Sequence, residues 1–142
     1  MKILKTAMVV FACLLVTSVM AGNRQTKVFL FGFAASFNDS TVYFTDIQTL
    51  DGAWVSSKNN FLLNRDNYSY QLRDYLASQD EEHRTCMVSY AFSEKEILRK
   101  MEKLKSRYTS GLKNRKGGHS YNIKQLSSSD FHFNLISNDD SE

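Results

Sequence analysis

The chain has 142 residues, of which 42% are hydrophobic and 23% charged, and its formal net charge is +3. These values are typical of a folded globular domain, and they argue against extensive disorder. The sequence contains no proline, which excludes rigid proline-rich linkers and slow isomerisation of X-Pro bonds.

The N-terminus has the pattern of a secretory signal peptide. Two lysines precede an almost continuously apolar run, residues 6–20, and Ala21 supplies a small residue at the cleavage position. We therefore expect cleavage before Gly22 and a secreted or periplasmic protein. Two alternatives remain open: a retained membrane anchor, for which the run is short, and a lipoprotein acylated at Cys13, whose preceding residues match poorly.

Loss of residues 1–21 would leave a single domain, residues 22–136, and a disordered acidic tail, residues 137–142. The net charge would fall from +3 to +1, because two lysines leave with the leader. Cys86 would then be the only cysteine, which excludes an internal disulfide. Its apolar neighbours favour burial, and a disulfide to a second molecule is the alternative.

The first predicted elements form a β-hairpin. Two runs rich in β-branched and aromatic residues, 28–37 and 41–48, flank the turn-forming residues 38–40. Gly32 lies inside the first run, where glycine marks a bulge or the close approach of another element. We expect residues 22–26 to be a polar lead-in, Asp51-Gly52 to form a turn, and residues 55–64 to form a loop.

Two amphipathic helices follow. The first should begin near Asp66, capped by Asn64 or Asp66, with its apolar face at Tyr68, Leu72, Tyr75 and Leu76. The second begins with a capping box, in which Ser93 is the N-cap and Glu96 the third helical residue, and it should stop near Gly111. Its apolar face is formed by Ile97, Met101, Leu104 and Tyr108.

Three further strands complete the predicted fold, at residues 84–92, 121–126 and, as a short final strand, 131–135. The order β-β-α-β-α-β-(β) predicts an α+β fold: a mainly antiparallel sheet of four or five strands with both helices on one face. One or two right-handed crossovers should connect the later strands.

A cluster of lysines and arginines occupies residues 99–116, and Glu102 is the only acidic residue among them. Lys113, Arg115 and Lys116 lie in its glycine-containing end, a candidate anion-binding loop. The alternative is a solvated helix face, whose cations suit a helix C-terminus. Export makes nucleic acid an unexpected partner.

Aromatic residues are frequent enough to supply a ligand surface as well as a core. The candidate ligand-binding residues are four aromatic residues and two carboxylates close to them in sequence: Tyr43, Asp46, Asp51, Trp54, Tyr68 and Tyr70. Exposed rings of this kind bind sugars and peptides. The alternative is that these rings pack in the core.

Signatures of catalysis and of cofactor binding are weak. The three histidines are isolated, no Cys-x-x-Cys or His-x-x-x-His pair occurs, and we expect neither a metal nor another cofactor. His83 and Cys86 are spaced so that one strand would not direct them to one place. No catalytic residue is assigned, and a binding protein is favoured over an enzyme.

Three segments carry a resemblance to a known group of proteins: residues 28–47, the run Asp51-Gly52-Ala53-Trp54, and residues 67–76. They resemble short secreted proteins of Bacteroidales-type bacteria. The resemblance implies a bacterial envelope setting, and it brings no activity and no site residues.

The sequence thus predicts an exported, non-enzymatic binding or interaction module of the bacterial envelope. Its ligand would be a glycan, a peptide or an envelope protein. The alternatives are a small secreted hydrolase that uses carboxylates, and a structural envelope component.

Overall fold

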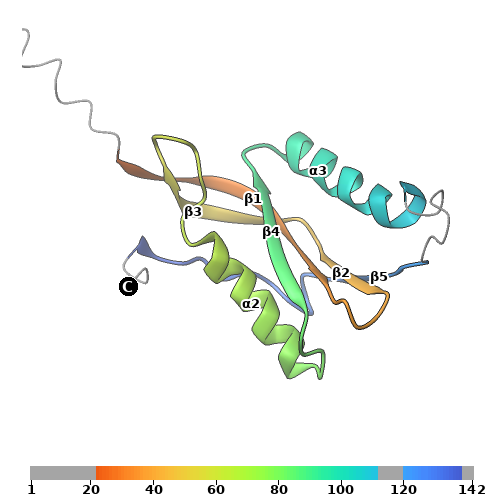
Figure 1. Cartoon of the computed structure of the whole chain (residues 1–142). Coiled ribbons are helices and arrows are strands. Elements are labelled where there is room, and N and C mark those ends of the chain that lie inside the picture. The colour runs from red at the N-terminus through yellow and green to blue at the C-terminus, as the bar shows by residue number, and fades with distance from the viewer. Residues whose placement is uncertain (1–21, 112–119, 139–142) are drawn as a thin grey trace, which may run out of the picture.

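The computed structural model describes residues 22–111 and 120–138 (Figure 1). Its elements, in chain order, are β1 (Asn23–Ala35), β2 (Thr41–Thr45), β3 (Gln48–Ser56), α2 (Arg65–Ser78), β4 (Thr85–Ala91), α3 (Glu94–Ser106), the π-helical turn η1 (Arg107–Gly111) and β5 (Asn122–Leu126). The expected signal peptide, the basic loop at 113–118 and residues 139–142 of the expected acidic tail lie outside the described residues.

Strand β1 is the centre of a five-stranded sheet. Residues 29–30 pair with both β3 and β4, and residues 33–35 pair with both β2 and β4. Strand β4 therefore lies on one side of β1, and β2 and β3 share the other side. These pairs are antiparallel, and β5 joins the outer edge of β2 in parallel. The predicted α+β class, with a mainly antiparallel sheet and two helices, is confirmed.

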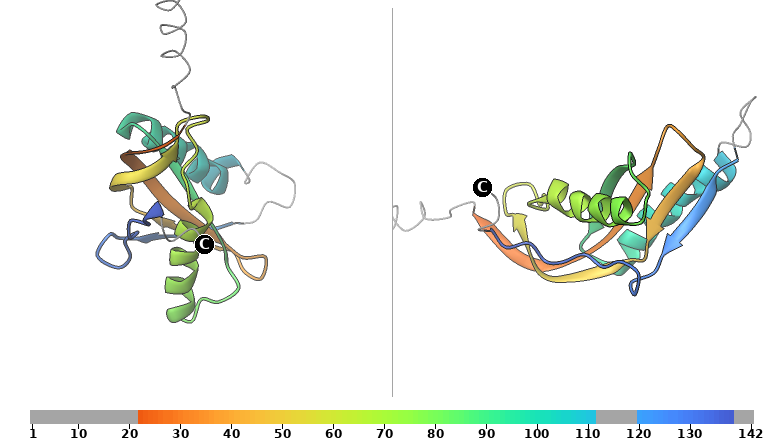
Figure 2. Two further views of the ribbon diagram at one scale, coloured as in Figure 1. Left: turned by 90° about the vertical axis from the view of Figure 1, so that its left-hand side faces the viewer. Right: turned by 90° about the horizontal axis from the view of Figure 1, so that it is seen from below.

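The two helices cover opposite faces of the sheet, so the prediction that both lie on one face is wrong. Leu30 and Ala34 of β1 pack in one core with Leu72 of α2. Phe31 and Phe33, which point the other way, pack in a second core with α3. Figure 2 shows α2 inside the curve of the sheet and α3 outside it. Because both faces of β1 carry large apolar side chains, each face needs its own cover.

The strands differ from the expected ones between residues 22 and 56. β1 begins at Asn23, inside the expected polar lead-in, because its first residues pair with the end of β3. The second expected strand breaks at residues 46–47, and the chain then continues along β1 as β3. Gly52 lies within β3 with φ +82°, opposite a shift in register, so Asp51-Gly52 forms an irregularity in a strand and not a turn.

The helix starts are partly as expected. The Ser93 hydroxyl accepts a hydrogen bond from the Glu96 backbone N–H at 3.2 Å, which confirms it as the N-cap of α3. The Glu96 carboxylate lies 3.8 Å from Lys100 Nζ, one turn along the helix. Asn64 precedes α2 in a left-handed conformation, and its side chain makes no capping hydrogen bond.

Residues 131–136 form a strap along the α2 face, where a short final strand was expected. The alternation of apolar and polar residues in this segment does match its burial, since Phe131 and Phe133 are buried. Side chains replace a neighbouring strand: the Gln71 amide accepts from Asn134 N at 2.8 Å and donates to Asn134 O at 2.9 Å. The Gln48 amide accepts a hydrogen bond from Phe133 N at 2.7 Å and donates one to Phe131 O at 3.0 Å. A glutamine amide has the same donor and acceptor groups as a peptide bond.

Gly32 allows α2 to approach the sheet closely, as one of the two interpretations of this glycine predicts. A Cβ at this position would lie 2.7 Å from Leu72 Cδ2 and 3.0 Å from Phe133 Cζ.

We expect Gly32→Ala to lower the free energy of unfolding by about 1–3 kcal/mol, because the helix and the strap must shift. Urea denaturation measures the change. Gly22→Ala is the control, since nothing lies within 4 Å of its added Cβ, and equal stability of the two variants would contradict the packing role.

Gln71→Leu tests the side-chain pairing of the strap. The Asn134 amide should exchange its hydrogen faster than in the parent protein, because the acceptor of its hydrogen bond is gone. The Phe133 amide, which bonds to Gln48, serves as the internal reference. If hydrogen exchange by NMR shows both amides unchanged, Gln71 does not hold the strap.

Candidate functional site

The structure does not gather the six predicted ligand-binding residues into one surface. Tyr43 is 6% exposed and Tyr68 is 1% exposed, and both belong to the core on the α2 face. Trp54 is half-buried at the other end of the sheet. The β1 partners of Tyr43 and Trp54 are Ala34 and Gln25, which places the two residues near opposite ends of β1. For Tyr43 and Tyr68, core packing is the role that the structure shows.

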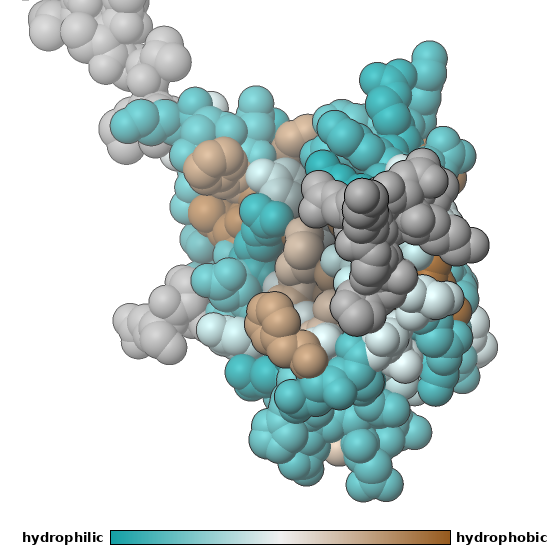
Figure 3. All heavy atoms as spheres, turned by 45° about the vertical axis from the view of Figure 1, so that its right-hand side comes forward, coloured by the Kyte–Doolittle hydropathy of each residue, from teal (hydrophilic) through white to brown (hydrophobic). Residues whose placement is uncertain are grey.

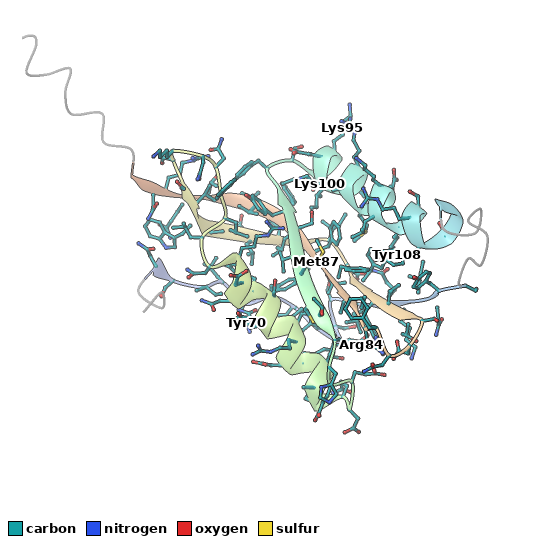
Figure 4. All side chains as sticks on the ribbon, in the orientation of Figure 1. Tyr70, Arg84, Met87, Lys95, Lys100 and Tyr108 are labelled. Atoms are coloured by element: carbon teal, nitrogen blue, oxygen red, sulfur yellow. The ribbon has the colours of Figure 1, made fainter. Side chains whose placement is uncertain are left out.

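The three other members of that set lie apart on the surface. Tyr70 is on the outer side of α2 (Figure 4), where the Arg73 guanidinium lies 4.3 Å from its ring centre. Asp51 is exposed and pairs with Lys27 at 3.7 Å. Asp46 accepts hydrogen bonds from Gln125 Nε2 at 3.0 Å and Ser128 N at 3.1 Å, which fixes the end of β5. The predicted anion-binding residues Lys113, Arg115 and Lys116 lie outside the described residues.

A buried arginine organises a polar cluster. The Arg84 side chain is 3% exposed, and its Nη2 lies 2.7 Å from Asp39 Oδ2 and 2.8 Å from Glu81 Oε2. Its Nη1 donates to Thr41 O at 2.9 Å, and its guanidinium lies 4.9 Å from the centre of the Tyr43 ring. These contacts tie the β1–β2 loop to the segment between α2 and β4.

This cluster brings two carboxylates together, yet its electrostatics suit a structural role. Hydrogen bonds from Arg84 hold the pKa of Asp39 and that of Glu81 below their ordinary values. Both groups are therefore ionised near neutral pH, where an ionised carboxylate accepts hydrogen bonds and has no proton to donate. The buried guanidinium needs both negative partners.

The remaining candidates for catalysis and metal binding stay apart. Burial raises the pKa of the Cys86 thiol to about 11, which leaves little thiolate at neutral pH. His83 lies 3.9 Å from Glu82 in an exposed turn. Within residues 22–111 and 120–138, no three His, Cys, Asp or Glu side chains are close enough to hold a metal ion.

The outer edge of β4 is covered by two cations. In an antiparallel strand, the N–H and C=O groups of one residue point to the same side of the strand. The Gly32 N–H donates to Thr45 Oγ1, so the main chain of Gly32 points to the β2 side of β1. Its β4 partner, Val88, therefore directs its main chain away from β1. The Val88 carbonyl accepts from Arg65 Nε at 2.9 Å, and the Tyr90 carbonyl accepts from Lys100 Nζ at 2.7 Å. Cations at a sheet edge hinder the addition of another strand.

A groove runs beside β4 on the α3 face, and we call it the β4–α3 groove. It consists of two hollows that meet at Met87. The larger has a volume of about 340 Å³ and is mainly apolar, with the lining residues Phe33, Ala35, Phe37, Met87, Tyr108 and Tyr121. The smaller, of about 200 Å³, has Phe31, Met87 and Leu104 among its lining residues, together with three cations, Lys100, Lys103 and Arg107.

Aromatic rings in contact with one another form the wall of the larger hollow. The ring centres of Phe33 and Tyr108 are 5.2 Å apart, and those of Tyr108 and Tyr121 are 5.0 Å apart at an interplanar angle of 90°. Phe37 is fully exposed and Met87 is 40% exposed. In Figure 4, Met87 lies on β4, below Lys100 and to the left of Tyr108, and Figure 3 shows hydrophobic surface in the middle of the molecule. Exposed apolar side chains gathered in this way mark interaction sites.

The groove follows from the widths of a helix and a sheet. Four strands, in the order β4-β1-β2-β5, lie side by side at this level, so the outer two are about 14 Å apart. A helix is only about 10 Å across. Helix α3 packs in one core with β1, β2 and Ala91 at the end of β4, and Lys105 Nζ bonds Gln125 Oε1 on β5 at 2.9 Å. Met87, farther along β4, is left partly uncovered.

Comparison of the chain with protein-family models, curated proteins and solved structures finds no match in any of the three. In the part of the chain that the structure describes, no helix is long and apolar enough to cross a membrane. Sequence reasoning missed the groove, because it assigned Tyr108 and Leu104 to the apolar face of a helix. The exposed Phe37, next to a polar turn, is the one local signal of this site.

The Arg84 cluster predicts sensitivity to acid. A carboxylate whose pKa is lowered in the folded state stabilises that state above its ordinary pKa, and this contribution is lost as pH falls through the lowered value. The ordinary values are 3.8 for Asp39 and 4.5 for Glu81. The free energy of unfolding should therefore drop on acidification from about pH 4.5 downward.

Arg84→Met removes the cause of both shifts. This variant should be less stable than the parent at pH 7, and it should lose less stability between pH 5 and pH 3. Urea denaturation at several pH values measures both effects. Equal pH slopes for the variant and the parent protein would assign the acid response to other groups.

Proposed function

We propose that this chain is an exported, non-enzymatic binding module of the bacterial envelope, and that it holds an apolar ligand in the β4–α3 groove. The observation that carries the proposal is the pair of hollows joined at Met87, whose side chain is 40% exposed above buried Phe31 and Phe33. Export is supported by the signal-like N-terminus, and the envelope setting by the resemblance to short secreted bacterial proteins.

The dimensions of the groove support a ligand site. Small-molecule sites are concave, mostly apolar and commonly 300–1,000 Å³ in volume. The larger hollow, at about 340 Å³, lies at the lower end of that range, and the second hollow extends it. The rings of Phe33, Tyr108 and Tyr121 already pack on one another, so the wall is formed before a ligand arrives.

Binding is better supported than hydrolysis by the groups that the structure describes. A hydrolase that uses two carboxylates needs one that keeps a proton near neutral pH. Asp39 and Glu81 are the carboxylates that the fold brings together, and Arg84 lowers the pKa of both. The described residues that line the groove include no carboxylate and no histidine.

Met87→Gln tests the groove as the site of binding. A neutral apolar dye, N-phenyl-1-naphthylamine, should bind the parent protein and fluoresce more brightly. The variant should bind it about three- to tenfold more weakly, because a polar amide replaces apolar contact at the centre of the groove.

Leu98→Gln is the matched control, since Leu98 is also exposed, at 49%, and lines neither hollow. It should bind the dye as the parent does. Circular dichroism and urea midpoints check that both variants are folded. Equal dye affinity for the parent and Met87→Gln would place the site elsewhere, and absence of dye binding to the folded parent would refute an apolar site.

A further inference from the structure

The groove has a cationic end at which the described residues supply no countercharge. Lys103 and Arg107 line the smaller hollow, and neither makes an ion pair with any residue that the structure describes. They are four residues apart where α3 passes into η1, a spacing that brings side chains to one face and makes like charges repel. An anion bound between them would relieve this repulsion.

Lys100, the third cation of the smaller hollow, is already engaged. Its Nζ donates to Tyr90 O at 2.7 Å and lies 3.8 Å from Glu96 Oε1. The charge available to a ligand is therefore that of Lys103 and Arg107. No acidic side chain of the described residues lines either hollow, so the groove is apolar at one end and positive at the other.

We propose that the ligand is a single-chain amphipathic anion, with its alkyl chain in the larger hollow against Tyr108 and its anionic group between Lys103 and Arg107. This inference rests on the proposed function and specifies its ligand class. A carboxylate, a sulfate or a phosphate head group can each bind the two cations, because each offers several anionic oxygens to Lys and Arg.

The length of the groove sets the length of the chain. Its lining runs along β4 from Ser89 to Thr85, a rise of about 13 Å for an antiparallel strand. An extended alkyl chain on the order of ten carbons spans that distance, given ordinary C–C bond lengths. Each methylene that the groove buries should strengthen binding by about fourfold until the larger hollow is full.

The edge of β4 favours this ligand over an extended peptide. A peptide that adds as a strand needs the outward carbonyls of β4, and those of Val88 and Tyr90 already accept hydrogen bonds from Arg65 and Lys100. An alkyl chain has no hydrogen-bonding groups to satisfy, so it can lie in the groove without disturbing these two bonds.

The test compares compounds with alkyl chains of nine or ten carbons and different head groups: decanoate, decyl sulfate, decanol and decyltrimethylammonium, each below its micellar concentration. Displacement of N-phenyl-1-naphthylamine measures affinity at low salt. The two anions should bind about tenfold more tightly than decanol, and the cation should bind most weakly. Added salt should reduce the advantage of the anions. Butyrate should bind much more weakly than decanoate.

Lys103→Gln/Arg107→Gln should abolish the preference for anions, measured within the variant as the affinity of decanoate and decyl sulfate relative to decanol. Lys95→Gln/Arg99→Gln is the matched control: it removes the same charge at the same spacing from α3, and neither residue lines the groove. In Figure 4, Lys95 points away from Met87. This control should retain the preference for anions.

The outcomes separate the two proposals. Met87-dependent dye binding without any head-group preference would overturn the ligand class and leave the binding function in place. A preference for anions that the control variant also loses would assign it to the general charge of the helix, and would equally overturn the inference. An acidic ten-residue peptide that competes better than decanoate would assign the groove to peptides. A folded parent that binds neither dye nor decyl chains would overturn both proposals.

Discussion

Burial of strand β1 on both faces is the constraint on which the rest of this structure depends. Its side chains alternate between two cores, and Leu30 and Phe31, which are adjacent in sequence, are both almost completely buried. A strand of this kind must be central and must be covered twice. The hairpin partner, the edge strand β4 and the two helices all take their positions from it.

The two faces are covered in different ways, and this difference produces the candidate site. On one face, Gly32 lets α2 approach closely, and the strap at residues 131–136 fills the remaining width. On the other face, α3 is too narrow to cover all four strands, so Met87 and the rings near Tyr108 remain accessible. The groove is the part of the second face that one helix cannot cover.

Charged residues divide into those that the fold uses and those that it leaves unpaired. Arg84 is buried with two carboxylates, and Arg65 and Lys100 bond to carbonyl groups of β4. Each of these charges has a structural reason. Lys103 and Arg107 have no such partner among the described residues, and they stand where the apolar groove ends. The unpaired cations therefore single out the groove. The overall composition does not, because it shows only a modest net charge.

The sequence by itself determined what depends on neighbours along the chain. Alternation and turn chemistry located the hairpin, helical periodicity located both helices, and Ser93 marked a helix start that the structure confirms. Only the tertiary structure decided that the helices cover opposite faces, since the pairing of β4 with β1 depends on contacts between distant segments. The tertiary structure also decided that β3 extends through Gly52, where pairing with β1 overrode a local turn signal. It likewise decided the position of the groove. Met87 and Tyr108 each look like core residues locally, and whether a side chain is covered depends on what packs above it.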